Sequence, residues 1–305
     1  MVLMMRRWCS SPVFCARSRV SRVPYRASSS SVPLRVAVPT GGLAGALGSL
    51  CGIGGGVVII PALSGTTAMS PKAVSAASLF CVSVASMTGA ASYLEQGFTN
   101  VPIALTLMST SIPGAALGAR LIHLIPGSVL KRLSGGVMLA AAPMIWTSAD
   151  AQRADRAELE ATLRRLSERN RVRPEMLSAC TPDRVLAFVG SHADFVALGF
   201  ITGLASGIIG IGGGLVMNSY MGSCTTMPQH EIVATSLAVA VPIGISGSLV
   251  HYSAGNIHVR SCGAIALSAF VAMGFTSRFL DQIEDGHLKR IFAVVLAGSA
   301  LNMLR

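Results

Sequence analysis

The chain has 305 residues, of which 51% are hydrophobic and 12% are charged. Soluble domains carry about 25% charged residues, so this composition excludes an ordinary water-soluble domain and indicates a membrane protein. The formal net charge of +11 does not indicate nucleic-acid binding, because the basic excess lies in one N-terminal segment and not on a folded basic face.

Residues 1–35 form that segment, with seven arginines and no acidic residue. It is rich in serine and has no apolar stretch of the length that a secretory signal needs, which is typical of an organelle presequence. Mitochondrial import is our first expectation and plastid import is the second. The alternative is a disordered basic tail that faces the cytoplasm. In that case the protein could lie in the plasma membrane.

Eight apolar segments follow, four on each side of a polar linker. They run over residues 36–63, 73–94, 100–122 and 129–147, and then over 185–218, 232–252, 261–280 and 288–304. Most of these segments are close in length to a membrane-spanning helix, which requires about 20 residues. We therefore predict an all-α integral membrane protein with two membrane units, residues 36–147 and 185–305. The linker at 148–184 has the charge and leucine spacing of a surface helix over residues 150–169.

An internal repeat relates the two membrane units. The pentapeptide Gly-Ile-Gly-Gly-Gly occupies residues 52–56 and again 210–214, at a spacing of 158 residues (210 − 52 = 158). The same spacing relates Gly45 to Gly203, Ser78-Leu79 to Ser236-Leu237, Gly89 to Gly247, Gly97 to Gly255, Arg120 to Arg278 and Lys131-Arg132 to Lys289-Arg290. A duplicated unit of this kind predicts a substrate site between two symmetry-related repeats.

The glycines interrupt the first apolar segment of each unit, which favours a broken helix or a re-entrant hairpin. Four crossings per unit would give parallel repeats, whereas three crossings and a hairpin would give inverted repeats. The Lys and Arg counts of the short loops favour neither topology.

The two glycine clusters are the first candidate for chemistry. A Walker loop needs Gly-Lys-Ser/Thr after its glycines, whereas Val57 or Leu215 follows here, and a dinucleotide fingerprint needs a preceding strand. Inside a membrane, consecutive glycines unwind a helix and leave backbone N–H groups at the positive end of the next helical piece, which favours an anion site. Close helix packing by small residues is the alternative. The candidate substrate-binding residues are Gly54, Gly55, Gly56, Gly212, Gly213 and Gly214.

Arginine and small polar side chains extend this candidate site. Arg120 and Arg278 lie near the ends of the third segments, where they could attract an anion or reach to the membrane surface. Ser78 and Ser236 are equivalent in the repeat, and with Asn218 they could donate hydrogen bonds to an oxyanion. Such side chains more often bond backbone carbonyls, which is the alternative.

The ordered glycine pattern, given twice, resembles the TauE/SafE family, the sulfite exporter-like or DUF81 membrane proteins. The pattern is G-x-x-x-G, then G-I-G-G-G-x-x-x-x-P, then A-x-S-L and a glycine-bearing loop, over about residues 38–147 and 196–304. The matching positions are Gly41, Gly45, Gly52, Gly54, Gly55, Gly56, Pro61, Ala76, Ser78 and Gly89, and Gly199, Gly203, Gly210, Gly212, Gly213, Gly214, Ala234, Thr235, Ser236 and Gly247.

Ser219 stands where the second proline of this pattern is expected, so the second helical piece could start or bend differently. The resemblance implies a polytopic transporter of sulfur-containing anions such as sulfite or organosulfonates, driven by an ion gradient.

We therefore predict a transporter of small anions that works by alternating access between two repeats. Its partners are a small anionic substrate and the lipid bilayer, with a homo-oligomer left open and no nucleic acid expected. No Asp or Glu lies deep in a predicted span, so proton coupling would have to use Glu231, His251 or titration of the substrate itself.

Two other classes of protein remain as alternatives. A membrane-embedded enzyme would need a nucleophile or a metal cluster, but His123, His251, His258 and Cys224 match no ligand spacing, and the seven cysteines contain no C-x-x-C pair. We therefore expect no catalytic residue, metal or cofactor. A non-transporting assembly subunit would instead bind its partner through the helix at 150–169.

Overall fold

The computed structural model describes residues 32–67, 69–151, 193–225, 227, 229–257 and 259–278, together with 297, 298 and 300. Over these ranges the chain is helical and has no strand. The leader up to residue 31, the linker from 152 to 192 and most of the last apolar segment lie outside the described residues. The predicted surface helix at 150–169 therefore falls almost entirely outside them.

The first half of the described chain contains α2 (Leu34–Cys51), α3 (Gly56–Thr66), α4 (Pro71–Glu95), α5 (Val101–Leu121), the 3-10 helix η1 (Ile122–Leu124) and α6 (Gly127–Ala151). The second half contains α10 (Ala193–Ile209), α11 (Gly214–Cys224), α12 (Gln229–Ser253) and α13 (Val259–Arg278). Helices 34–51, 71–95, 101–124 and 230–253 are long and apolar enough to cross a membrane.

The helices of the second half follow those of the first at the spacing seen in the sequence. Helices α3 and α11 start 158 residues apart (214 − 56) and also end 158 apart (224 − 66), and the same holds for α4 and α12 (229 − 71 and 253 − 95). In the part of the chain that is described, the glycines with positive φ form four pairs at this spacing: Gly52 and Gly210, Gly54 and Gly212, Gly55 and Gly213, Gly97 and Gly255.

Local signals in the sequence set where the central helices begin. Ser70 caps α4 by accepting a hydrogen bond from the amide of Ala73 at 3.3 Å, and Pro71 takes the first helical position, where no N–H is needed. Asn100 caps α5 in the same way through the amide of Ile103.

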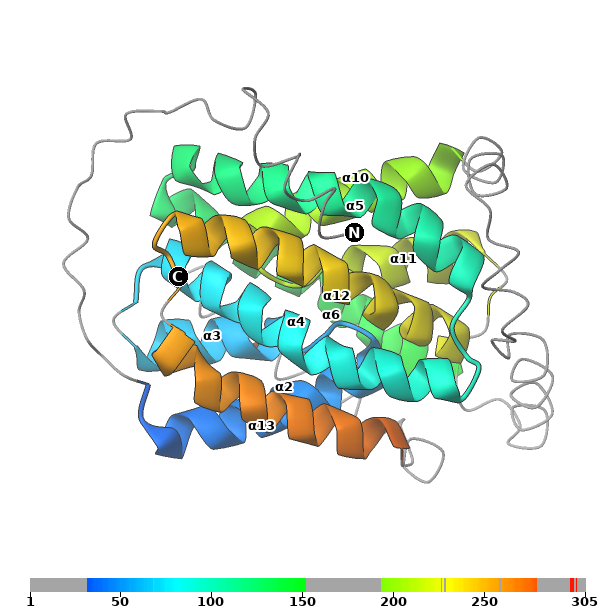
Figure 1. The fold of residues 1–305 in the computed structure, drawn as a ribbon, viewed down its shortest axis with the longest axis horizontal. Coiled ribbons are helices and arrows are strands. Elements are labelled where there is room, and N and C mark those ends of the chain that lie inside the picture. The colour runs from blue at the N-terminus through cyan, green and yellow to red at the C-terminus, as the bar shows by residue number, and fades with distance from the viewer. Residues whose placement is uncertain are drawn as a thin grey trace, which may run out of the picture.

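Figure 1 shows α4 and α12 packed side by side in the middle of the molecule and running in opposite directions. The chain enters α4 at the left of this view and enters α12 at the right. Helix α3 runs back toward the side from which α2 comes, so α2 and α3 form a hairpin. Helices α10 and α11 form a second hairpin, which enters from the opposite side of the molecule. An 11-residue helix such as α3 or α11 is about 16 Å long, roughly half of a bilayer core.

The first helix of each hairpin packs on a helix from the other half, α2 on α13 and α10 on α5. Glycines make this approach close. A Cβ added at Gly45 would overlap the carbonyl oxygen of Ala269, and a Cβ added at Gly203 would overlap that of Ser111. Small-residue packing, the alternative considered for the glycine clusters, thus applies to the G-x-x-x-G positions.

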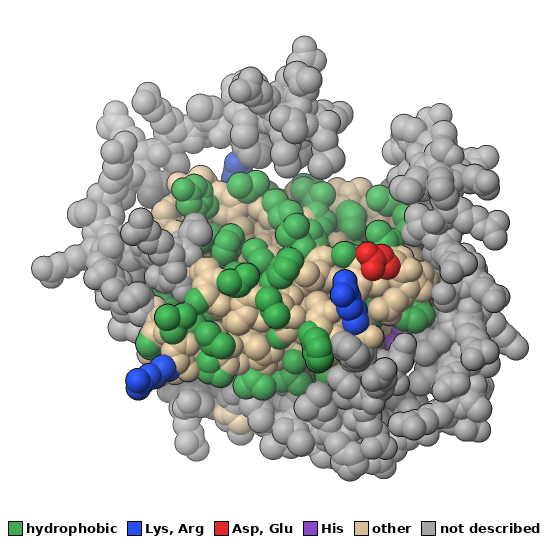
Figure 2. Space-filling model, turned by 60° about the horizontal axis from the view of Figure 1, so that its bottom comes forward, with side chains coloured by type: hydrophobic (Ala, Val, Ile, Leu, Met, Phe, Trp, Pro, Cys, Tyr) green, Lys and Arg blue, Asp and Glu red, His purple; other side chains and the backbone are tan. Residues whose placement is uncertain are grey.

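Large hydrophobic side chains also cover the outside of the helices. Figure 2 shows one face on which such side chains spread over the described surface with few charged groups among them. The exposed ones include Leu43 on α2, Met87 on α4, and Leu267, Val271 and Phe275 on α13. A surface of this kind is costly in water and suits contact with lipid.

Gly45 and Gly42 offer a test of the helix contact, because both lie inside α2 but a Cβ at Gly42 would meet nothing within 4 Å. Gly42→Ala should stabilise the protein by up to about 1 kcal/mol through helix propensity. Gly45→Ala should destabilise it by about 1–3 kcal/mol, because the added methyl group forces α2 away from α13. Thermal unfolding of both variants in detergent measures the difference, and equal stability would contradict this packing.

Candidate functional site

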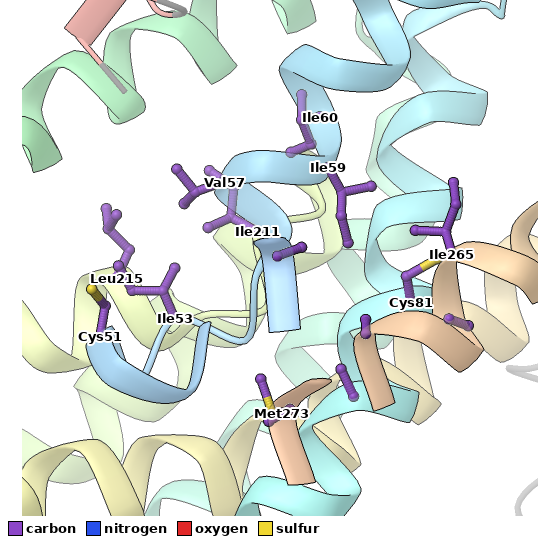
Figure 3. Packing of buried hydrophobic residues seen from close by; sticks show 14 of the residues in the cluster. Cys51, Ile53, Val57, Ile59, Ile60, Cys81, Ile211, Leu215, Ile265 and Met273 are labelled. Atoms are coloured by element: carbon purple, nitrogen blue, oxygen red, sulfur yellow. The ribbon is translucent and has the colours of Figure 1, made fainter. Parts of the chain in front are cut away.

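The two breaks, Gly52–Gly55 and Gly210–Gly213, lie against each other in the interior of the molecule. A Cβ added at Gly56 would lie 2.9 Å from Cα of Ile211, and one added at Gly214 would lie 2.9 Å from Cα of Ile53. The breaks therefore run antiparallel. In Figure 3, Ile53 lies beside Leu215 and Val57 beside Ile211, so each break contacts the helix that follows the other.

Each break ends at a glycine that is the N-cap of the next helix. Gly55 (φ 83°) and Gly213 (φ 81°) are the N-caps of α3 and α11, in a left-handed conformation that other residues rarely adopt. Neither helix has a side-chain cap, and neither has an acidic residue in its first turn. The positive ends of two half-length helices thus face the centre of the molecule without a negative side chain of their own.

Ser78 and Ser236, the equivalent pair predicted from the sequence, lie at the breaks. The Ser78 hydroxyl donates to the carbonyl of Gly210 at 2.9 Å, and the Ser236 hydroxyl donates to the carbonyl of Gly52 at 2.9 Å. Both side chains are fully buried. Each serine therefore pairs a carbonyl that the end of a helix in the other half leaves without an amide partner.

Asn218 and Ser75 also pair carbonyls at the helix ends. The carbonyls that they bond lie one or two residues before those bonded by Ser236 and Ser78. The Asn218 amide donates to the carbonyl of Cys51 at 2.5 Å, and the Ser75 hydroxyl donates to the carbonyl of Ile208 at 2.9 Å. The predicted polar site residues are thus brought together, but in this structure their hydrogen atoms point to backbone carbonyls.

Arg120 and Arg278 are not brought to the breaks. They lie in the last turns of α5 and α13, and both side chains are exposed, whereas the residues of the breaks are buried. Their positions at helix ends suit the second interpretation, in which a long side chain reaches toward the membrane surface.

Three buried hydroxyls near the breaks were missed by the sequence analysis. Ser86, Thr202 and Ser206 are at most 2% exposed, and their oxygen atoms have no hydrogen-bond partner among the described residues. The Ser86 oxygen lies 3.0 Å from where a Cβ on Gly54 would stand. The repeat gave no signal for them, because their equivalents are Gly244, Ala44 and Gly48.

Ser219 does not change the bounds of α11, although it stands where a proline was expected. Helices α3 and α11 both contain 11 residues and start and end at equivalent positions. The Ser219 hydroxyl donates to the carbonyl of Leu215, the residue equivalent to Val57. The expected difference in where this helix starts is therefore not found.

The titratable residues considered for proton coupling lie on α12. Glu231 is fully buried in the first turn, where the Asn100 side-chain amide donates to its Oε1 at 2.8 Å. His251 is fully buried near the other end, and its Nε2 donates to the carbonyl of Gly207 at 3.1 Å. Among the described residues, no group of three or more His, Cys, Asp or Glu could hold a metal ion.

Comparison with known proteins identifies the family. The model of the family "Sulfite exporter TauE/SafE" matches residues 37–303, which include both breaks and the helices that pack on them. This chain belongs to the TauE/SafE family. The resemblance drawn from the repeated glycine pattern is confirmed.

Relatives in this family are described as transporters. The chain is 26% identical over 239 residues to the probable membrane transporter protein YunE of Bacillus subtilis, covering 76% of this chain and 82% of that protein. It is 22% identical over 266 residues to YjnA of the same organism (85% and 95%), and 25% identical over 290 residues to MJ0441 of Methanocaldococcus jannaschii (90% and 95%), both also named probable membrane transporter proteins. No solved structure matches the chain significantly. The protein is therefore a multi-pass membrane protein of a transporter family.

Removing either serine tests the pairing of the two carbonyls. Ser78→Ala and Ser236→Ala should each lower the free energy of unfolding by about 1–3 kcal/mol, because a buried carbonyl loses its donor. Ser64→Ala is the control, since that hydroxyl is exposed and bonds within its own helix to the carbonyl of Pro61. Denaturation of the purified variants in detergent should leave this control within about 0.5 kcal/mol of wild type. Wild-type stability in both buried variants would disprove the role of the serines.

Proposed function

We propose that this protein carries small sulfur-containing oxyanions, such as sulfite or an organosulfonate, across a membrane. The observation that carries the proposal is the pair of half-length helices whose N-termini meet at the breaks without a side-chain cap or an acidic residue in the first turn. Helix N-termini attract anions through their free amides and the helix dipole. The name of the family supports a sulfur oxyanion as the substrate class.

We further propose that the two halves are inverted repeats that give alternating access to this site. The equal spacing of helix bounds and the opposite directions of α4 and α12 favour this arrangement over parallel repeats. The reciprocal contacts favour it too, because Ser78 bonds Gly210 where Ser236 bonds Gly52. Discontinuous helices at the interface of inverted repeats are a common design for substrate sites in transporters.

Flux into liposomes tests the proposed substrate class. Purified protein should give saturable uptake of sulfite or of a sulfonate such as sulfoacetate, above that of empty liposomes. Sulfate and a carboxylate of similar size show whether the sulfur oxyanion is preferred, and a monovalent cation is the negative control. Saturable cation flux without anion flux would overturn the proposal, and so would hydrolysis or conversion of the substrate.

We propose an organelle membrane as the location, with the mitochondrion first. Residues 1–35 carry seven arginines and no acid, as import into a compartment that is negative inside requires.

A fluorescent protein fused after Arg35 should therefore accumulate in mitochondria. Replacing Arg17, Arg19, Arg22 and Arg26 with Gln should reduce import, because the membrane potential acts on each positive charge with about 2.3 kcal/mol per 100 mV. The same residues replaced with Lys form the control, which keeps the charge and should keep import. Intact protein at the plasma membrane that retains its leader would contradict this location.

A further inference from the structure

The two breaks share their pattern of positive-φ glycines but differ in the polar side chains on the helices that precede them. At the first break, α2 presents Ala44 and Gly48, which have no polar group. At the equivalent positions of the second break (44 + 158 and 48 + 158), α10 presents Thr202 and Ser206. The second break thus gains two hydroxyls that the first lacks.

The Thr202 side chain lies beside the N-cap of α11. A Cβ added at Gly213 would stand 2.7 Å from Cγ2 of Thr202, so the Thr202 side chain is in direct contact with the start of this helix. Ser206 follows Thr202 by four residues, so the two side chains lie on the same face of α10, with Ser206 one turn closer to the break.

Neither hydroxyl has another role in the described structure. Thr202 is 0% and Ser206 is 2% exposed, and neither oxygen has a hydrogen-bond partner among the described residues. Ser75, Ser78, Asn218 and Ser236 differ from them, because each already donates to a carbonyl at the start of the opposite break or at the end of the helix before it. Buried hydroxyls are rarely left without a partner, so two of them on the face of α10 that contacts the N-cap of α11 point to a ligand that pairs them.

We propose that Thr202 and Ser206 donate hydrogen bonds to a bound oxyanion at the N-cap of α11, which makes the second break the tighter subsite. The inference rests on the proposed function, since it assigns residues to the same anion site. An anion with three or more oxygens, such as sulfite or a sulfonate, can accept from both hydroxyls and from the backbone amide of Gly213 at once. A halide has a single accepting atom and gains less from this arrangement.

Thr202 variants separate the hydroxyl from the shape of the side chain. Thr202→Val keeps the volume and removes the hydroxyl, whereas Thr202→Ser keeps the hydroxyl. Ser206→Gly and Thr202→Ala place the first-half residues on the second half. Loss of one hydrogen bond to a charged ligand should weaken sulfite binding about tenfold or more, and Thr202→Ser should stay within about threefold of wild type.

Thr106→Val is the matched control, because Thr106 is equally buried but its hydroxyl bonds the carbonyl of Pro102 in its own helix. The measurements are the sulfite-dependent rise of the unfolding temperature in detergent and the KM of sulfite uptake, each compared with chloride. Wild-type sulfite affinity in Thr202→Val and Ser206→Gly would overturn the inference, as would equal losses in Thr202→Val and Thr202→Ser. Absence of anion binding and flux in the wild-type protein would instead refute the proposed function itself.

Discussion

The structure depends on the pairing of backbone carbonyls where two helices end inside the protein. Helices α2 and α10 stop at Cys51 and Ile209, and the last carbonyls of a helix have no amide partner within it. Water could pair such groups at a surface, but in a membrane interior each unpaired carbonyl costs several kcal/mol. Ser236 and Asn218 pair those at the end of α2, and Ser78 and Ser75 pair those at the end of α10. Each half therefore completes the other.

This exchange of donors limits how the protein could move. Rocking of one sequence half against the other would break the bonds from Ser78 to Gly210 and from Ser236 to Gly52. It would also separate α2 from α13 and α10 from α5, where glycines hold the backbones in contact. A moving unit that preserves these two helix contacts would combine elements of both halves, with α2 and α13 on one side and α5 and α10 on the other.

The sequence predicted most of the helices because their signals are local. Apolar length gave α4, α5 and α12, and the glycine runs gave both breaks. The hairpin geometry could not be predicted in the same way. A broken helix that crosses the membrane and a hairpin have the same composition, and the Lys and Arg counts of the loops favour neither topology. The sequence left two partners open for the Ser78 hydroxyl, an oxyanion or a backbone carbonyl. A sequence does not show whether a carbonyl lies within reach of a hydroxyl. Thr202 and Ser206 were missed for another reason: the search relied on repeat symmetry, and these residues break it.

Some departures from symmetry place polar or titratable groups on the second half alone. Thr202 and Ser206 replace Ala44 and Gly48, and buried Glu231 stands where the first half has Ala73. His251 and Tyr93 are the clearest case, because they are equivalent and bond the equivalent carbonyls of Gly207 and Ser49.

The same structural task is thus done by a phenol in one half and by an imidazole, which can take up a proton, in the other. If both halves share one backbone, then a difference in chemistry between the two faces of the membrane must come from substitutions of this kind. A transporter driven in one direction by an ion gradient needs such a difference, and in this protein Glu231 and His251 on α12 are titratable candidates for it.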